Sequence, residues 1–232
     1  MIGNRRLVSG ASLVVAAAFV LLSGPAAVAA NGSSDGYTAD QLAKVENALV
    51  DAGATPSQIE KILGDPVLIE TVPVDFTVTS SASSPVASGL FRVEDATLAP
   101  MSVGSSCTGS SGYRAVTVYL RSLAGNALGS YKMTTRFCYN GSQVTYAYSQ
   151  YVGNITTSGS IGGLEYNGVQ SSSEGFGIYN GHSNGKVDSY SQAKFTENIL
   201  WIGVRSVYPS ISTSVRYNGT STYSYTCTGC TF

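Results

Sequence analysis

The stretch "FCYNGSQVTY" (residues 137–146) indicates a β-hairpin and points to the fold class of the whole chain. Asn-Gly is the strongest short hairpin signal, because a two-residue type I′ turn needs positive φ at both central residues, which Asn tolerates and Gly adopts freely. A turn at Asn140-Gly141 pairs Tyr139 with Ser142. The flanking strands then have one mostly large, apolar face and one polar face, so the sequence predicts a core side and a water side.

The predicted register follows directly from that turn. On the core side it pairs Phe137 with Val144, Thr135 with Tyr146 and Met133 with Tyr148. On the water side it pairs Cys138 with Gln143, Arg136 with Thr145 and Lys132 with Ser149. A shift by one residue would exchange the two sides, so this register also predicts which side chains are buried.

The triplet Tyr-Asn-Gly occurs four times, beginning at Tyr139, Tyr166, Tyr179 and Tyr217. The triplet can be interpreted as a repeated binding motif or as a repeated β-turn motif. The consistent hairpin around Asn140 favours the turn. The same reasoning suits Asn218-Gly219, whereas the two middle copies lie in Gly- and Ser-rich surroundings and fit a hairpin less clearly.

From about Val72 onward the apolar period is that of β-strands. The runs are "VDFTVTS", "RAVTVYLRS", "SYKMTTRFCY", "QVTYAYSQYV", "KVDSYSQAKF", "LWIGVRSVY" and "ISTSVRY". Gly, Asn, Ser and Pro separate them, as they separate short strands. Many short strands without interspersed helices predict an all-β domain over residues 74–232, an antiparallel sandwich or barrel.

An acidic segment, residues 31–73, precedes this domain and carries a short helical extension. Thr38 is a good helix N-cap, and apolar residues then recur at helical spacing until Gly53. A second helix begins with Thr55 as the cap and Pro56 at the first helical position, and it stops at Gly64. The apolar stripe of these two helices is small, so they must pack on something to be stable.

The first thirty residues have the pattern of a secretory signal peptide. Arg5 and Arg6 form a basic start, an apolar run follows, and "GPAAVAA" ends in the small residues of a cleavage site. No other stretch is long and apolar enough to span a bilayer. We therefore expect a secreted, extracellular protein with no membrane association after cleavage near Ala29 or Ala30.

Charge is scarce and unevenly distributed. Only 12% of residues are charged. Residues 31–75 have eight acids and two bases, and residues 76–232 have six acids and nine bases. This content of Lys and Arg argues against nucleic acid as a partner, because phosphate binding needs clustered cations. The asymmetry allows the acidic segment to clamp onto the β domain as an N-terminal pro-segment.

The four cysteines are Cys107, Cys138, Cys227 and Cys230. An even number in an exported chain indicates disulfides, for which three connectivities exist. Cys227-Thr228-Gly229-Cys230 also allows a redox pair or half of a metal site. No helix follows it, as a redox pair would need. Cys107 and Cys138 could complete a zinc site, but an exported protein more readily oxidises its cysteines, so a structural disulfide is favoured and no metal or cofactor is expected.

Several motifs together resemble a group of small secreted proteins of actinobacteria. They are a Cys about thirty residues before "CYNG", then "QAKF" (Gln192–Phe195), "YPSI" (Tyr208–Ile211) and "NGT" (Asn218–Thr220). The resemblance covers about Cys107–Tyr225 and implies that Cys107 pairs with Cys138. It implies no activity, and the terminal "CTGC" departs from the group's pattern.

Candidate site residues belong to two chemistries. A glycan hydrolase needs a carboxylate pair, for which Glu165 and Glu174 are the weak candidates because they flank a Gly-rich stretch. A glycan-binding surface needs flat aromatic rings among amides and hydroxyls. The candidates for it are Tyr146, Tyr148, Tyr151, Tyr223 and Tyr225. Against this, Tyr is also simply a favoured strand residue.

These patterns favour a secreted, non-enzymatic protein that binds glycan or cell wall. Two alternatives stay open: a secreted glycan hydrolase that uses a carboxylate pair, and a secreted toxin or signal held by an N-terminal pro-segment.

Overall fold

The structure is a computed structural model that describes residues 36–83, 86–87, 101–198 and 204–230. The expected signal peptide, residues 1–30, lies outside the described residues. The helices are α1 (Ala39–Asp51), α2 (Pro56–Leu63), α3 (Pro66–Ile69) and α4 (Thr157–Ile161). The strands are β1 (Asp75–Ala82), β2 (Val86–Ala87), β3 (Met101–Val103), β4 (Ser110–Arg121), β5 (Ala127–Tyr139), β6 (Val144–Ile155), β7 (Leu164–Tyr179), β8 (His182–Asn198), β9 (Val204–Arg216) and β10 (Ser221–Thr228).

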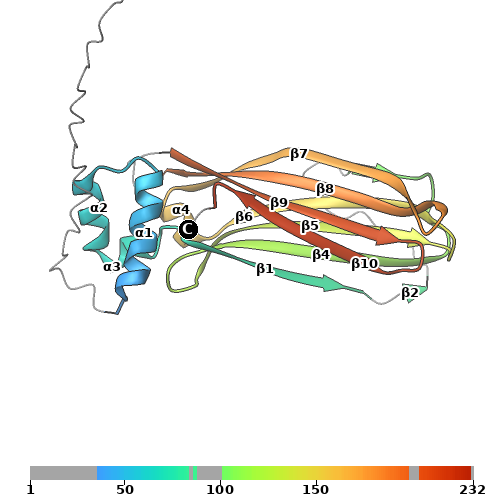
Figure 1. The fold of residues 1–232 in the computed structure, drawn as a ribbon, viewed down its shortest axis with the longest axis horizontal. Helices are drawn as coiled ribbons and strands as arrows, with labels where there is room; N and C mark the ends of the chain where they lie inside the picture. Colours follow the sequence, from blue (N-terminus) through green and yellow to red (C-terminus); the bar gives the residue numbers. More distant parts are fainter. Residues whose placement is uncertain (1–35, 84–85, 88–100, 199–203, 231–232) are drawn as a thin grey trace, which may run out of the picture. The chain divides into compact units, whose positions relative to one another are not determined.

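The strands form two antiparallel sheets, which confirms the predicted all-β sandwich (Figure 1). The six-stranded sheet has the order β1-β4-β5-β6-β3, with β2 paired to β4. The four-stranded sheet has the order β10-β9-β8-β7. Side chains alternate between the inside of the sandwich and an outer face, as in any strand. In β8, for example, Val187, Ala193 and Phe195 are buried, while Tyr190 and Lys194 are partly exposed.

The inside of the sandwich holds two apolar clusters with a polar belt between them. One cluster includes Met133, Phe195 and Ile211, and the other includes Phe137 and Val215. The belt consists of side chains from both sheets: Thr135, Ser149, Glu174, Ser189 and Thr213. Hydrogen bonds join them across the sandwich, so the interior is not continuously apolar.

The hairpin at Asn140 exists, but the predicted register is wrong by three residues. Phe137 pairs with Ala147 and Met133 with Tyr151, and a register irregularity falls between Cys138 and Tyr139. Because the shift is odd, Tyr146 and Tyr148 point to the outer face and Ser149 and Tyr151 point inward. The water-side pairs change too: Cys138 faces Tyr146, Arg136 faces Tyr148 and Lys132 faces Val152.

The reason for the shift is the side chain of Asn140. Its Oδ1 accepts hydrogen bonds from the backbone N–H groups of Ser142 (3.1 Å) and Gln143 (3.0 Å). The Asn140 N–H in turn donates to the Gln143 carbonyl at 3.1 Å. Residues 140–143 therefore close a four-residue loop, and Asn140 does not take the positive φ that a type I′ turn requires.

The other Tyr-Asn-Gly copies have three different backbone roles. Asn180 and Gly181 both have positive φ between the paired Tyr179 and His182, so this copy makes the two-residue type I′ hairpin. Gly219 alone has positive φ in a three-residue loop, the type I turn with a bulge. Asn167 and Gly168 lie at a register irregularity inside β7. Each copy lies at a turn or a strand irregularity. The type I′ turn is at Asn180-Gly181, however, and not at Asn140-Gly141, where the sequence signal was clearest.

The helical extension forms as predicted and gains one short helix. Thr38 caps α1 with a capping box, and Thr55 and Pro56 begin α2 as expected. The unpredicted α3 begins after Asp65, whose carboxylate accepts from the N–H groups of Val67 and Leu68. The apolar faces pack around Leu49, Ile62 and Val74. Val74 already belongs to the chain entering β1, so the extension shares its core with the β domain.

Glu70 connects the extension to the turn between β4 and β5. Its carboxylate accepts from the Ser122 hydroxyl (2.5 Å), the Ala124 N–H (3.0 Å) and the Asn126 side-chain amide (3.4 Å). Tyr37 donates to the same carboxylate at 2.8 Å. The extension is thus joined to the β domain by hydrogen bonds to one carboxylate as well as by shared apolar packing.

Replacing Glu70 by Ala should destabilise the protein by about 1–3 kcal/mol, because several donors lose a charged acceptor. Urea denaturation followed by circular dichroism measures this change. Glu60→Ala, at an exposed position of α2, is the matched control and should be nearly neutral. Equal effects of the two changes would contradict the anchoring role of Glu70.

Candidate functional site

The outer face of the four-stranded sheet carries rows of polar side chains, most of them Ser and Thr. The pairing register aligns Ser173, Tyr190, Ser212 and Ser224 across β7, β8, β9 and β10. The next row on one side contains Asp188, Ser214 and Thr222, and the row on the other side contains Ser171, Gln192, Ser210 and Thr226. We call this surface the hydroxyl face.

A shallow groove of about 370 Å³ lies on the hydroxyl face. The groove is lined by Ser173, Asp188, Tyr190, Ser212, Ser214, Thr222 and Ser224, among others. Tyr190 supplies a ring, Asp188 a carboxylate, and the rest supply hydroxyls that donate and accept hydrogen bonds. The Lys186 ammonium lies 2.5 Å from the Asp188 carboxylate. The groove offers many hydrogen-bonding partners and one flat apolar surface.

Further rings lie at both ends of the hydroxyl face. At the hairpin end, the Tyr179 ring lies 4.6 Å from the Arg216 guanidinium and 6.1 Å from the Tyr217 ring. At the other end, the Lys194 ammonium lies 6.0 Å from the Tyr208 ring. Tyr208 precedes Ser212 by four residues along β9, a separation of roughly 13 Å. Rings therefore occur at the two ends and in the middle of one polar surface.

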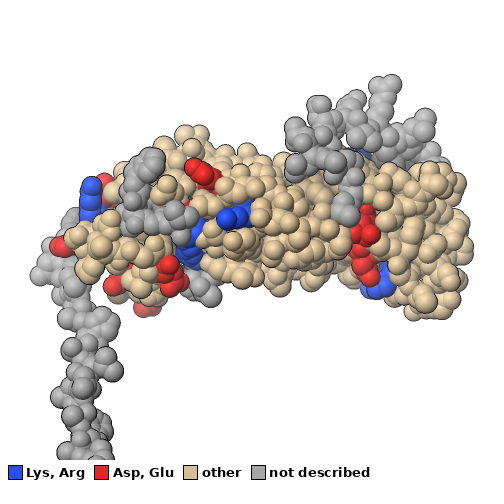
Figure 2. Space-filling view, turned by 90° about the horizontal axis from the view of Figure 1, so that it is seen from above, with Lys and Arg blue, Asp and Glu red and all other residues tan. Residues whose placement is uncertain are grey.

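Charged side chains are few on the side of the molecule shown in Figure 2. Away from the helices most of that surface consists of uncharged residues. This agrees with a chain in which only 12% of residues are charged. Polar contact with a partner must therefore come mainly from hydroxyl and amide groups on such a surface.

The structure does not bring the five predicted tyrosines together. Tyr146 and Tyr148 are on the outer face of the six-stranded sheet, where Tyr148 is nevertheless buried, and Tyr151 points into the core. Tyr223 and Tyr225 are exposed but lie on the inward side of the edge strand β10. There Tyr225 packs against Phe76 and Tyr223 against Arg114, so these rings close the edge of the sandwich.

The hydroxyl face was missed by the sequence reasoning, although a signal for it exists. In β9 and β10 small hydroxyl residues occupy alternate positions, as at Ser212, Ser214, Thr222, Ser224 and Thr226. An alternation of hydroxyls with apolar residues predicts a polar outer face.

The two candidate carboxylates lie on opposite sides of the same sheet. Glu165 is exposed and pairs with Thr196 on the outer face. Glu174 points inward, where its Oε1 accepts from the hydroxyls of Ser189 (2.6 Å) and Ser149 (2.9 Å). Burial raises the pKa of Glu174, and the two hydroxyls oppose that shift. Residues that face opposite sides of a sheet cannot act on one glycosidic bond.

Both disulfides form, and the pairing that the resemblance implied is present. Cys107 bonds to Cys138 over a sequence separation of 31, and Cys227 bonds to Cys230 over a separation of 3. By loop closure alone, the longer loop contributes about 4 kcal/mol and the shorter about 2 kcal/mol. Cys227 and Cys230 pack against the larger apolar cluster.

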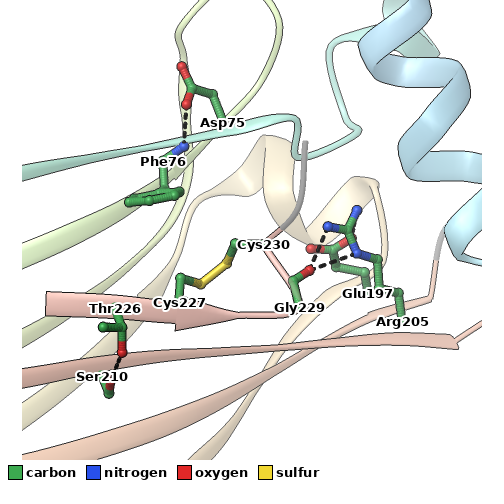
Figure 3. The surroundings of a disulfide bond; sticks show 9 residues. All are labelled: Asp75, Phe76, Glu197, Arg205, Ser210, Thr226, Cys227, Gly229 and Cys230. Carbon is green, nitrogen blue, oxygen red and sulfur yellow. Dashed lines mark hydrogen bonds and ion pairs between the residues drawn. A yellow bond between two sulfur atoms is a disulfide. The ribbon is translucent and has the colours of Figure 1, made fainter.

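A buried ion pair adjoins the Cys227–Cys230 disulfide (Figure 3). Arg205 donates to the Gly229 carbonyl through Nε (3.2 Å) and Nη2 (2.7 Å). Its Nη1 lies 4.0 Å from the carboxylate of Glu197, which is 1% exposed. Burial raises the pKa of Glu197 to about 7, and the Arg205 charge opposes this only in part. The sequence reasoning gave Glu197 and Arg205 no role, because their pairing depends on the register of β8 and β9.

Comparison of the chain with protein-family models, with curated proteins and with solved structures finds no match. Within the described ranges, no helix has the length and apolar character to cross a membrane. The same part of the chain contains no group of three or more His, Cys, Asp or Glu side chains placed to hold a metal ion. The function is therefore inferred from the geometry of the hydroxyl face.

The raised pKa of Glu197 predicts a pH dependence of stability. The folded protein binds the proton more readily than the unfolded chain, so the contribution of Glu197 is most favourable below about pH 4.5 and is lost as pH rises to about 7. The difference in unfolding free energy between the native protein and Glu197→Gln should change by a few kcal/mol over this window. Urea denaturation at several pH values measures it. Glu165→Gln is the exposed control, and a pH-independent difference for Glu197→Gln would contradict the assignment.

Proposed function

We propose that this protein is a secreted, non-enzymatic protein that binds polysaccharide through the hydroxyl face. The observation that carries the proposal is the groove in which the Tyr190 ring lies among hydroxyls and the carboxylate of Asp188. Sugars present flat C–H faces and a rim of hydroxyl groups. A tyrosine ring can pack on the former, and serine, threonine and carboxylate oxygens can bond to the latter.

The arrangement of the rings favours a chain-like ligand over a single small molecule. The groove is shallow, whereas sites for small molecules are usually concave enough to bury most of the ligand. Tyr179, Tyr190 and Tyr208 follow one another along the strands of this face. A polysaccharide lying along β8 and β9 would contact all three, and many weak contacts would add up.

Two further features support an extracellular role. The first thirty residues have the basic start, apolar run and small-residue cleavage site of a signal peptide. Two disulfides are typical of proteins that mature in an oxidising compartment. Cell-wall or environmental polysaccharide is accessible from that compartment.

A hydrolase on this fold is less well supported. The sequence-predicted pair fails geometrically, because Glu165 is outside the sandwich and Glu174 is inside it. Asp188 is the carboxylate of the groove, and its partner is the Lys186 ammonium rather than a second acid. Retaining and inverting glycosidases both need two carboxyl groups around the bond that breaks.

The proposal predicts that Tyr190→Ala and Tyr208→Ala each weaken retention on insoluble polysaccharide by about tenfold, as expected when a buried aromatic contact is removed. Pull-down on cellulose, chitin, α-glucan and isolated cell wall measures retention, and the supernatants are assayed for released sugar. Tyr113→Ala, on the outer face of the six-stranded sheet, is the matched control and should bind like the native protein.

Two results would contradict the proposal. If Tyr113→Ala reduces retention as much as Tyr190→Ala does, the hydroxyl face is not the binding site. Release of soluble sugar would show catalysis, and the assignment as a binding protein would then be wrong.

A further inference from the structure

The edge strand β10 lacks the features that stop the other described sheet edges from pairing with another chain. Natural edge strands avoid such pairing by being short, by register irregularities or by charged residues. β2 and β3 are at most three residues long, β7 has three register irregularities and the inward-pointing Glu174, and β1 begins with Asp75. β10 has no charged residue and no proline, and it pairs with β9 without any irregularity.

Alternate residues of β10 point their backbone N–H and C=O groups away from β9. In an antiparallel pair, residues that bond to the partner strand alternate with residues that do not. The Thr220 carbonyl accepts from the Arg216 N–H of β9, so the even-numbered residues of β10 bond to β9. The carbonyl of the odd-numbered Ser221 accepts instead from the Arg114 side chain at 2.7 Å. In the described ranges, the outward backbone groups of residues 223, 225 and 227 bond to no other strand.

Two aromatic rings lie beside these unpaired backbone groups and are only partly covered. Tyr223 contacts Arg114 and Tyr225 contacts Phe76, both on the inward side of the strand. The two tyrosines are nevertheless 40% and 43% exposed. A regular edge strand with exposed apolar side chains is a template for pairing with another strand. β10 therefore offers a partner strand both hydrogen bonds and apolar surface.

The sequence of β10 is complementary to a second copy of itself. The three outward-pointing residues are symmetric about Tyr225, so two β10 strands can pair antiparallel with Tyr225 opposite its equivalent in the second copy. Ser224 then lies opposite Thr226, and Tyr223 lies opposite Cys227. Opposed residues come from the same face of the strand, so hydroxyls meet hydroxyls and no like charges are brought together. A two-fold contact of this kind is closed and gives a dimer rather than a fibre.

We propose that two copies of this protein pair through their β10 strands and form an antiparallel dimer with two-fold symmetry. Because β10 is the end strand of the four-stranded sheet, the sheets of the two copies join into one continuous sheet. Their hydroxyl faces, each of which includes Ser224, then meet edge to edge. The dimer forms without polysaccharide, so it does not rest on the proposed function. If that function holds, the dimer presents two binding surfaces to one polysaccharide chain.

Sedimentation velocity of the purified protein over a range of concentrations, without polysaccharide, tests the proposal. We expect a dimer whose dissociation constant rises at least about tenfold in Tyr225→Pro, because proline removes an outward N–H at the centre of the contact. The bonds between β9 and β10 do not use that N–H, so the circular dichroism spectrum should stay unchanged. Tyr225→Ala is the matched control, which keeps the N–H and should weaken the dimer less. A native protein that is monomeric at every concentration up to about 100 μM would overturn the proposal.

A second pair of variants tests which edge of the sheet forms the contact. Ser173 and Ser224 are exposed, belong to the same row of the hydroxyl face and lie on its two opposite edge strands. Ser224→Lys places two ammonium groups about 8 Å apart across the two-fold axis. This variant should be monomeric at low salt and should dimerise again at high salt, which screens the repulsion. Ser173→Lys should dimerise like the native protein. Equal effects of the two changes, or dissociation by Ser173→Lys alone, would exclude β10 as the contact.

Discussion

The two-residue period of the strands is the constraint on which the rest of this structure depends. Along β8 and β9 one set of side chains enters the sandwich and the other set forms the hydroxyl face. The same strands therefore build the core and the proposed binding surface. A change of register by one residue would bury Tyr190 and expose Phe195, and both functions of the sheet would be lost together.

Side chains of the polar belt hydrogen-bond to one another inside the core, although the second carboxylate oxygen of Glu174 has no hydrogen-bond partner. The Thr135 hydroxyl hydrogen-bonds to those of Ser149 and Thr213, and the Glu174 carboxylate accepts hydrogen bonds from Ser149 and Ser189. Buried polar groups destabilise a fold when they lack partners, but when bonded they favour one arrangement of the two sheets. The belt helps to set the register between the two sheets, which are also joined by apolar contacts and by hydrogen bonds from Arg114 to Ser221 and between Tyr131 and Ser191. Glu197 and Arg205 form a second polar contact where β8 and β9 pair near the Cys227–Cys230 disulfide.

Fold class, helix caps and disulfide pairing could be anticipated from the sequence because each depends on local patterns or on a resemblance. Thr38, Thr55 and Pro56 act through neighbours in the chain, and the helices begin where these residues indicate. The register around Asn140 could not be anticipated, because it depends on whether the Asn140 side chain bonds to its own loop. These two bonds set the register and with it which tyrosines of β6 face the inside of the sandwich. The candidate site could not be assembled either, because Tyr190, Ser212 and Ser224 come together only through the pairing of separate strands.

Footprinting of the bound protein can show whether the outer face of β7–β10 is the surface that binds polysaccharide. The protein is labelled by a photoreactive carbene reagent while free and while retained on the polysaccharide that binds it, and mass spectrometry maps the protected residues. We expect protection of the hydroxyl face, centred on Tyr190, with the outer face of the six-stranded sheet labelled equally in both states. Protection around Tyr113 and Lys132 with Tyr190 unchanged would contradict it.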